Sequence, residues 1–131
     1  MAKQYEVSFT RAALKELKKL GPSASSSIIA QIRKKLVVDP VAYGEELHGE
    51  LKGFFKLRVS GYRVVYQVLQ QRVIVVVLAV GKRNEGNVDN IYDWLSESLL
   101  KGRLDAWERE IGGAGDDERE GSGEGGTSSG G

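Results

Sequence analysis

The fold is decided by residues 54–80, which read FFKLRVSGYRVVYQVLQQRVIVVVLAV. Apolar side chains alternate with polar or charged ones in the first half of this segment, as in strands that have one buried face. Ser60-Gly61 and Gln70-Gln71 lie where two-residue hairpin turns would reverse the chain. Residues 73–80 are apolar throughout, which predicts a strand in the interior of the sheet. We therefore expect three consecutive antiparallel strands over Phe54–Val59, Tyr62–Val68 and Arg72–Val80.

The residues before this segment predict one strand and a helical hairpin. Polar and apolar side chains alternate over 3–8, and apolar residues recur at helical spacing over 11–20 and 23–37. Thr10 can cap the first of these helices by accepting a hydrogen bond from its first turn. Gly21-Pro22 ends that helix, because glycine allows a left-handed cap and proline cannot continue the helix. So short a connection predicts that the two helices pack against each other.

The remaining residues predict a loop, a last helix and a tail. Asp39-Pro40 ends the second helix, because the residue before a proline is disfavoured in helical geometry, and residues 40–53 are expected to form a loop. A third helix is expected from about Asn90 through to Ile111. Glycine, serine and charged residues follow, as a native tail or an added linker, and predict disorder. We expect one compact α+β domain over 1–101, a helix extension over 102–111 and a disordered tail over 112–131.

The composition excludes several kinds of site. The chain has no cysteine and a single histidine, His48, so disulfides, thiolate metal sites and multi-histidine metal sites are all excluded. We expect no metal and no cofactor. The longest apolar run, Val73–Val80, is too short to cross a bilayer, and the first residues show no secretory signal. The sequence therefore predicts a soluble cytoplasmic protein without a membrane partner.

The charge of the chain is unevenly distributed. The formal net charge is +1, but residues 103–131 carry three basic and eight acidic side chains, which leaves 16 basic and 10 acidic ones in residues 1–102. A moderately basic domain suits a polyanionic partner. Basic residues that only keep a small domain soluble are an equally good interpretation of the charge alone.

The predicted hairpin gathers basic side chains on one face of the sheet. Lys56 and Arg58 are two residues apart on one strand, so they share a face. A two-residue turn at Ser60-Gly61 places Arg58 directly opposite Arg63, on the same face. Two arginines in this position repel each other, and a phosphate group between them would relieve the repulsion. Lys82-Arg83 follows the interior strand at the same end of the sheet, so that Arg83 can approach this patch.

Four motifs extend this pattern and resemble a known toxin family. They are Leu47-His48-Gly49, Lys56-Leu57-Arg58, SGYRVVYQV over 60–68, and Val80-Gly81-Lys82-Arg83. Their order and spacing resemble the signature of RelE-type toxins in the RelE/ParE superfamily. The resemblance implies a RelE-like α+β fold, with an N-terminal strand, a helical hairpin, a three-stranded meander and a C-terminal helix. It also implies a toxin of a type II toxin–antitoxin system that acts as a ribosome-dependent endoribonuclease.

The resemblance further implies partners and residue roles. The substrate would be mRNA in the ribosomal A site, in contact with ribosomal RNA, and a co-encoded antitoxin would neutralise the toxin. Cleavage would be a transesterification without a metal. The residues implied to be catalytic are Lys56, Arg63 and Arg83. The residues implied to bind substrate are Arg58, Lys82, Tyr92 and His48.

The sequence departs from the family pattern at two positions. The family's best-studied ribonucleases have a second lysine where this chain has Phe54, and a base-stacking tyrosine where strict spacing gives Asp89. Tyr92 takes that role only if three residues are inserted. These departures leave two alternatives to the ribonuclease: a ParE-like inhibitor of DNA gyrase, and a catalytically weak protein with the RelE fold.

Overall fold

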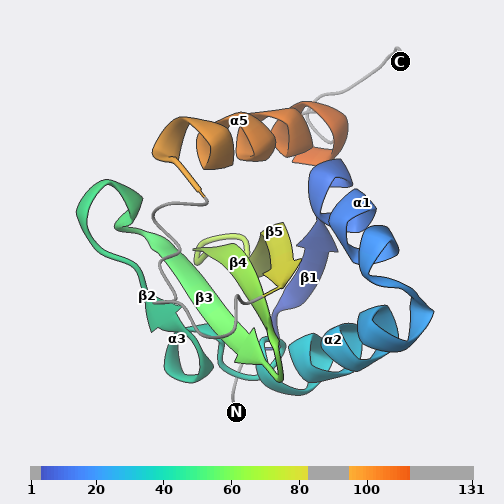
Figure 1. The fold of residues 1–131 in the computed structure, drawn as a ribbon. Helices are drawn as coiled ribbons and strands as arrows, with labels where there is room; N and C mark the ends of the chain where they lie inside the picture. The colour runs from blue at the N-terminus through green and yellow to red at the C-terminus, as the bar shows by residue number, and fades with distance from the viewer. Residues whose placement is uncertain (1–3, 83–94, 113–131) are drawn as a thin grey trace.

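A five-stranded mixed sheet forms the centre of the structure, in the order β1-β5-β4-β3-β2 (Figure 1). This computed structural model describes residues 4–82 and 95–112. Strands β3, β4 and β5 form the predicted antiparallel meander. Strand β2 pairs with β3 in antiparallel orientation, and β1 pairs with β5 in parallel orientation. The strands are β1 Glu6–Phe9, β2 Glu45–Glu46, β3 Phe54–Val59, β4 Tyr62–Leu69 and β5 Ile74–Lys82.

Two helices form the predicted hairpin between β1 and β2. Thr10 caps the first of them by accepting a hydrogen bond from the backbone N–H of Ala13 at 3.1 Å. Gly21 ends it with a φ of 94°, a left-handed value that favours glycine, and Pro22 begins the next helix at once. The helices are α1 Arg11–Leu20, α2 Pro22–Lys35, α3 Pro40–Tyr43 and α5 Glu97–Trp107, with the 3-10 turn η1 Gly49–Leu51 and the π-helical turn η2 Glu108–Gly112.

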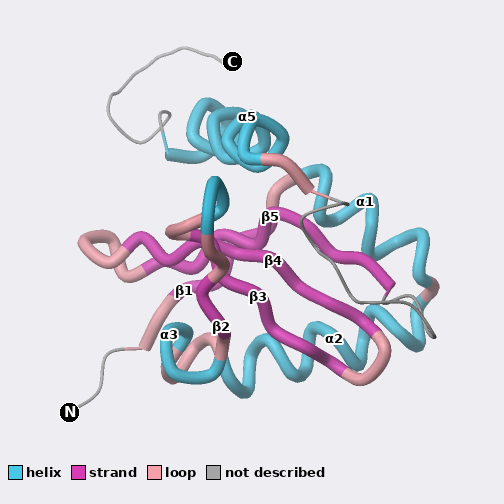
Figure 2. The backbone as a smooth tube through the Cα atoms, turned by 60° about the vertical axis from the view of Figure 1, so that its left-hand side comes forward, coloured by secondary structure: helices cyan, strands magenta, loops and turns pink. Residues whose placement is uncertain are grey.

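The helices cover the two faces of the sheet separately, with α2 and α5 on opposite sides (Figure 2). The face under α1 and α2 carries the hairpin-side core, and the face under α5 carries the α5-side core. Among the described helices, none is long and apolar enough to span a membrane. The hairpin-side core contains Ala13, Leu17, Ile28, Ile32, Leu36, Leu57, Val59, Val64, Tyr66, Val75, Val77 and Val80. The α5-side core contains Leu47, Leu51, Phe54, Val65, Val76, Leu78, Ala79, Leu95, Leu100 and Trp107.

Three expectations about local structure were wrong. The expected loop over 40–53 contains α3, β2 and η1. The turn expected at Gln70-Gln71 spans four residues and ends at Val73, which has a φ of 55°, so that β5 begins at Ile74. The first residues of the helix expected from about Asn90, 90–94, lie outside the described residues, and α5 begins at Glu97, where the side chain of Ser96 caps it. That helix and η2 continue to Gly112, as predicted, whereas the tail predicted after it lies outside the described residues.

The short strand β2 is held in place by a close contact between Gly44 and Tyr66. The Tyr66 side chain is fully buried, and its hydroxyl donates a hydrogen bond to the carbonyl oxygen of Pro40 at 2.5 Å. A Cβ atom at Gly44 would overlap this hydroxyl and would lie 3.2 Å from the carbonyl oxygen of Lys56. Any side chain at position 44 would therefore displace Tyr66 or shift the chain where it enters β2.

We expect Gly44→Ala to lower the free energy of unfolding by about 1–3 kcal/mol, because the added methyl group has no space. Tyr66→Phe should cost about 1 kcal/mol through the lost hydrogen bond. The double variant should lose less free energy of unfolding than the two single losses added together, since phenylalanine removes the atom nearest to the added methyl group. Urea unfolding of the four proteins measures this coupling, and strictly additive losses would contradict the contact.

Candidate functional site

The structure brings together Lys56, Arg58 and Arg63, here called the basic cluster, on the α5 side of the β3–β4 hairpin. Ser60-Gly61 forms the predicted two-residue turn, so that Arg58 lies directly opposite Arg63. Lys56 lies opposite Val65, a residue of the α5-side core. Because cross-strand partners share a face, the three cations point to one side of the sheet. The register predicted from the sequence is confirmed.

The three members of the basic cluster differ in exposure. Arg58 is exposed, the Lys56 side chain is 14% exposed, and Arg63 is buried at 4%. Arg63 lies on β4, in the interior of the sheet, with Arg58 opposite it on β3 and Gly81 opposite it on β5. The alternation of side chains predicted the shared face of the three cations but carried no information on the burial of Arg63. Arg58 is the guanidinium of the cluster that a ligand in solution meets first.

A carboxylate that the sequence analysis did not anticipate lies beside Lys56. Glu45 is its cross-strand partner on β2, and Glu45 Oε1 lies 3.8 Å from Lys56 Nζ. The Glu45 side chain is 71% exposed. The adjacent glutamates 45 and 46, followed by the buried Leu47, were the only signal for this residue in the sequence. Such a signal is weak, because two residues are too few to show the alternation of a strand.

The other predicted substrate-binding residues do not join the basic cluster in the described part of the structure. Lys82 pairs with Tyr62, which packs against the hairpin-side core, so Lys82 points to the face opposite the basic cluster. His48 is exposed and lies in the connection between β2 and β3, directly before η1. Arg83 and Tyr92 lie outside the described residues. Their roles stay predictions.

Two aromatic residues of the hairpin are not available to a substrate. Phe54, at the position of the family's second lysine, is buried in the α5-side core with 3% exposure. Tyr66 packs in the hairpin-side core and stacks on Phe55. Burial, and to a lesser degree the Asp39 carboxylate, raise the pKa of Tyr66 above its ordinary value. Tyr66 is therefore a neutral hydrogen-bond donor with a structural role.

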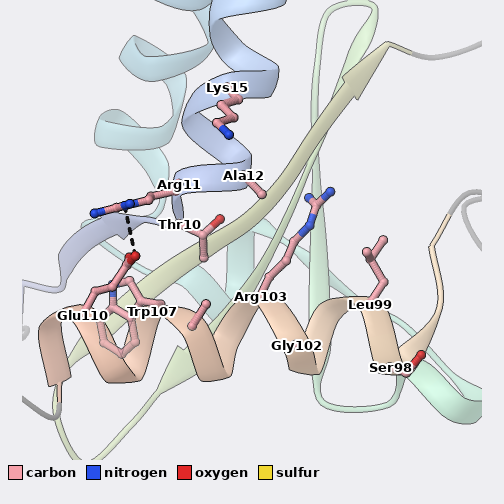
Figure 3. A pocket seen from close by; sticks show the side chains of 11 residues that line it. Thr10, Arg11, Ala12, Lys15, Ser98, Leu99, Gly102, Arg103, Trp107 and Glu110 are labelled. Atoms are coloured by element: carbon pink, nitrogen blue, oxygen red, sulfur yellow. Dashed lines mark ion pairs between the residues drawn. The ribbon is translucent and has the colours of Figure 1, made fainter.

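A cleft of about 460 Å³ lies between α1 and α5, apart from the basic cluster (Figure 3). Three of its four charged lining residues form ion pairs: Arg11 contacts Glu110 at 3.0 Å, and Arg103 contacts Glu16 on α1 at 3.0 Å. Within the described part of the chain, no group of three or more histidine, aspartate or glutamate residues is arranged to hold a metal ion. The basic cluster with Glu45 is therefore the candidate site.

Comparison with known proteins identifies the family of this chain. The family described as "ParE toxin of type II toxin-antitoxin system, parDE" matches residues 7–86. The chain is also 42% identical over 88 residues to the mRNA interferase toxin RelE of Escherichia coli, an alignment that covers 64% of this chain and 88% of that protein. The chain belongs to the RelE/ParE toxin family.

Solved structures of RelE/ParE toxins support the fold. The RelBE2 toxin–antitoxin complex of Mycobacterium tuberculosis contains a chain that matches with a TM-score of 0.59 and 32% identity, covering 62% of this chain and 93% of that one. A variant of Escherichia coli RelE in the free state matches with a TM-score of 0.51 and 29% identity, covering 80% and 97%. The RelE-like α+β fold expected from the sequence is thus confirmed, and this protein is a type II toxin of the RelE/ParE family.

The buried position of Arg63 leads to a prediction about stability. We expect Arg63→Ala to lower the free energy of unfolding by about 1–3 kcal/mol, because the side chain is packed inside the sheet. Arg58→Ala removes the same side chain from the opposite, exposed position and should change stability by less than about 0.5 kcal/mol. Urea unfolding of both variants measures the difference, and equal losses would mean that Arg63 is not packed as described.

Proposed function

We propose that this toxin is a ribosome-dependent endoribonuclease that cleaves mRNA by transesterification without a metal ion. The observation that carries the proposal is the pair Arg58 and Arg63, like charges directly opposite each other on neighbouring strands. Two guanidinium groups on one face of a sheet can each bind a phosphate group through charge-assisted hydrogen bonds. The name of the Escherichia coli relative, an mRNA interferase, supplies the class of anion, which is the RNA phosphate backbone.

The residues of the cluster have complementary parts in this reaction. Attack of a ribose 2′-hydroxyl on the adjacent phosphate increases the negative charge on the phosphate oxygens. Arg58, exposed, would contact the phosphate, while the buried Arg63 provides a fixed positive charge behind it. Preorganised cations stabilise a transition state without reorganisation at the moment of reaction. Lys56 would transfer a proton or stabilise the phosphate, and Arg83 would stabilise charge at the same centre.

We also propose that a co-encoded antitoxin neutralises the toxin by covering this face. The similar Mycobacterium tuberculosis structure is a toxin–antitoxin complex, which supports an antitoxin as the partner. An antitoxin segment with acidic side chains would complement the exposed Arg58 and the mostly buried Lys56. The same contacts would exclude the RNA phosphates.

The alternative target is DNA gyrase, because the matching family is named after ParE. A gyrase inhibitor acts by binding and has no need of a cluster of cations around a reacting phosphate. The presence of Lys56, Arg58 and Arg63 on one face therefore favours the ribonuclease.

Expression of the toxin without an antitoxin should stop translation before it stops DNA replication. Purified toxin should cut mRNA on programmed ribosomes. Lys56→Ala and Arg83→Ala should each restore growth, because loss of one charge-stabilising donor typically lowers a rate about 10²–10³-fold. Pulse labelling of protein and DNA, together with mapping of RNA 5′ ends, measures these effects.

A matched control is Lys34→Ala, which removes the same charge from the exposed surface of α2, on the other side of the sheet. This variant should remain toxic. If replication stops first and gyrase is trapped on cleaved DNA, the chain acts as the ParE alternative requires and the ribonuclease proposal is wrong.

A further inference from the structure

Helix α1 presents a row of cations to the solvent, here called the α1 basic face. It consists of Arg11, Lys15, Lys18 and Lys19. Their helical spacing places them on one side of α1, and all four are exposed. Ala13 and Leu17 face the other way, into the hairpin-side core. No acidic side chain of α1 lies on this face, because Glu16 is bound to Arg103 and to the backbone of β5.

Within the described residues, one of these four cations has an acidic partner. Arg11 Nε lies 3.0 Å from Glu110 Oε2, whereas Lys15, Lys18 and Lys19 form no ion pair with a described carboxylate. Like charges three or four residues apart on a helix repel each other. The helix dipole favours cations in the last turn, which explains Lys18 and Lys19 but not Lys15. The face can therefore accept an anionic ligand without breaking an existing ion pair at its three lysines.

The last described residues lie beside this face. The end of α5 and the turn η2 approach the start of α1, where Glu110 pairs with Arg11 (Figure 1). Figure 3 shows Arg11 and Lys15 on the α1 side of the cleft, with Glu110 on its other side. Gly112 follows Glu110 by two residues, so the chain continues from a point close to the first turn of α1.

The residues that follow Gly112 are strongly acidic. Residues 116–120 read DDERE, four carboxylates and one guanidinium, and they come directly after the short segment 113–115 of sequence GAG. An extended chain spans roughly 13 Å in four residues, so residues at and after 116 can reach any point along α1 from Gly112. The distance from Arg11 to Lys19 along the helix axis is about 12 Å. The acidic segment is therefore long enough to meet all three lysines.

Charge and position favour α1 over the other basic surfaces of the domain. The pair of Arg11 with Glu110 is already a contact between this face and the C-terminal end of the described chain, and the acidic segment continues the chain in the same direction. The cations at the end of α2 are farther away, because α2 covers the side of the sheet opposite α5 (Figure 2). A segment tethered so close to its site has an effective concentration in the millimolar range.

We propose that the acidic segment 116–120 of this chain lies along the α1 basic face and competes there with RNA. Carboxylates and RNA phosphates bind the same ammonium groups, so the tethered carboxylates must be displaced before RNA can contact α1. The segment thereby lowers the affinity of the toxin for RNA in general. The inference goes beyond the proposed ribonuclease and does not depend on cleavage.

Zero-length cross-linking of the full chain tests the contact directly. A carbodiimide joins a carboxylate to an ammonium group where the two are in contact. Mass spectrometry should find residues 116–120 joined to Lys15, Lys18 or Lys19, and these cross-links should fade near 1 M salt, where charges are screened beyond about 3 Å. Lys34, exposed on α2, is the comparison. Cross-links spread evenly over the lysines, or concentrated on Lys34, would overturn the proposed position of the segment.

Binding of a 2′-O-methyl oligoribonucleotide, which cannot be cleaved by transesterification, tests the competition. The neutral-tail variant of the full chain carries Asp116→Asn, Asp117→Asn, Glu118→Gln and Glu120→Gln. We expect it to bind the oligonucleotide about three- to tenfold more tightly at about 0.1 M salt, the effect of a few exposed ion pairs. The difference should vanish near 1 M salt. Fluorescence anisotropy measures both affinities.

Two further variants separate a local contact from the change in net charge. The α1 variant carries Lys15→Gln, Lys18→Gln and Lys19→Gln. The α2 variant carries Arg33→Gln, Lys34→Gln and Lys35→Gln, and so loses the same number of cations from the other helix of the hairpin. Adding the neutral-tail substitutions should strengthen RNA binding in the α2 variant and leave it unchanged in the α1 variant.

Each outcome of the binding test decides the inference. If the neutral-tail substitutions do not strengthen RNA binding, the segment does not compete with RNA. If they strengthen it equally in the α1 and α2 variants, the effect is one of net charge, and the proposed contact with α1 is wrong. Neither result bears on cleavage of mRNA, so the ribonuclease proposal is tested separately.

Discussion

Strand β5 extends beyond its neighbour β1, so that its last backbone groups have no strand partner on that side. The side chains that form hydrogen bonds with these groups hold the fold together. Residues 6–9 of β1 pair with residues 74–77 of β5, and on this side of β5 no strand in the described part of the chain continues past Val77, whereas β4 pairs with the other side as far as Lys82. Three polar side chains bond the β5 backbone there, and one of them is Thr10, whose hydroxyl donates to the carbonyl oxygen of Leu78 at 3.4 Å. The carbonyl oxygen of Leu78 accepts a hydrogen bond from Arg103 at 2.8 Å, and the N–H of Val80 donates one to Glu16 at 2.9 Å. A buried strand without such partners would carry unsatisfied backbone groups at a cost of about 1–3 kcal/mol each.

The side chains of Arg103 and Glu16 also bind each other, which ties α1, α5 and β5 into one unit. Arg103 contacts Glu16 through both terminal nitrogens, at 3.1 and 3.0 Å. This fork geometry is the strong form of an arginine–carboxylate pair. The end of α5 has further attachments, since Trp107 donates to the Ser8 hydroxyl at 2.7 Å and Arg72 lies over the Trp107 ring. The place of α5 on the sheet is therefore specified by directional polar contacts, in addition to the burial of Leu100 and Trp107.

The β3–β4 hairpin and the caps at the two ends of α1 could be predicted because each follows from local chemistry. A two-residue turn at Ser60-Gly61 fixes the register, and the register alone places Arg58 opposite Arg63. Strand β2 could not be predicted, because its two glutamates have no periodicity and the strand forms only where β3 offers a free edge. The pair of Glu45 with Lys56 depends on β2 and was missed for that reason.

The burial of Arg63 could not be predicted for a different reason. Alternation along a strand tells which face a side chain is on, but not how deeply that face is covered. The four-residue turn before β5 was also missed, because Val73 adopts a positive φ that a β-branched residue rarely takes. The predicted two-residue turn assumed ordinary geometry there. In both cases the tertiary environment, and not the local sequence, decided the outcome.

The hairpin can carry two arginines directly opposite each other because its stability comes from its other face. Leu57, Val59 and Val64 alternate with the cations along the same strands and are almost completely buried in the hairpin-side core. Full burial of such a side chain contributes about 1.5–3 kcal/mol, whereas an unfavourable cross-strand pair costs about 0.2–1 kcal/mol. The apolar face therefore outweighs the repulsion between Arg58 and Arg63 several times over. The contacts between Glu16 and Arg103 join α1, α5 and β5, whereas the basic cluster lies on β3 and β4. The contacts that hold α5 against the sheet are therefore separate from the residues of the candidate site.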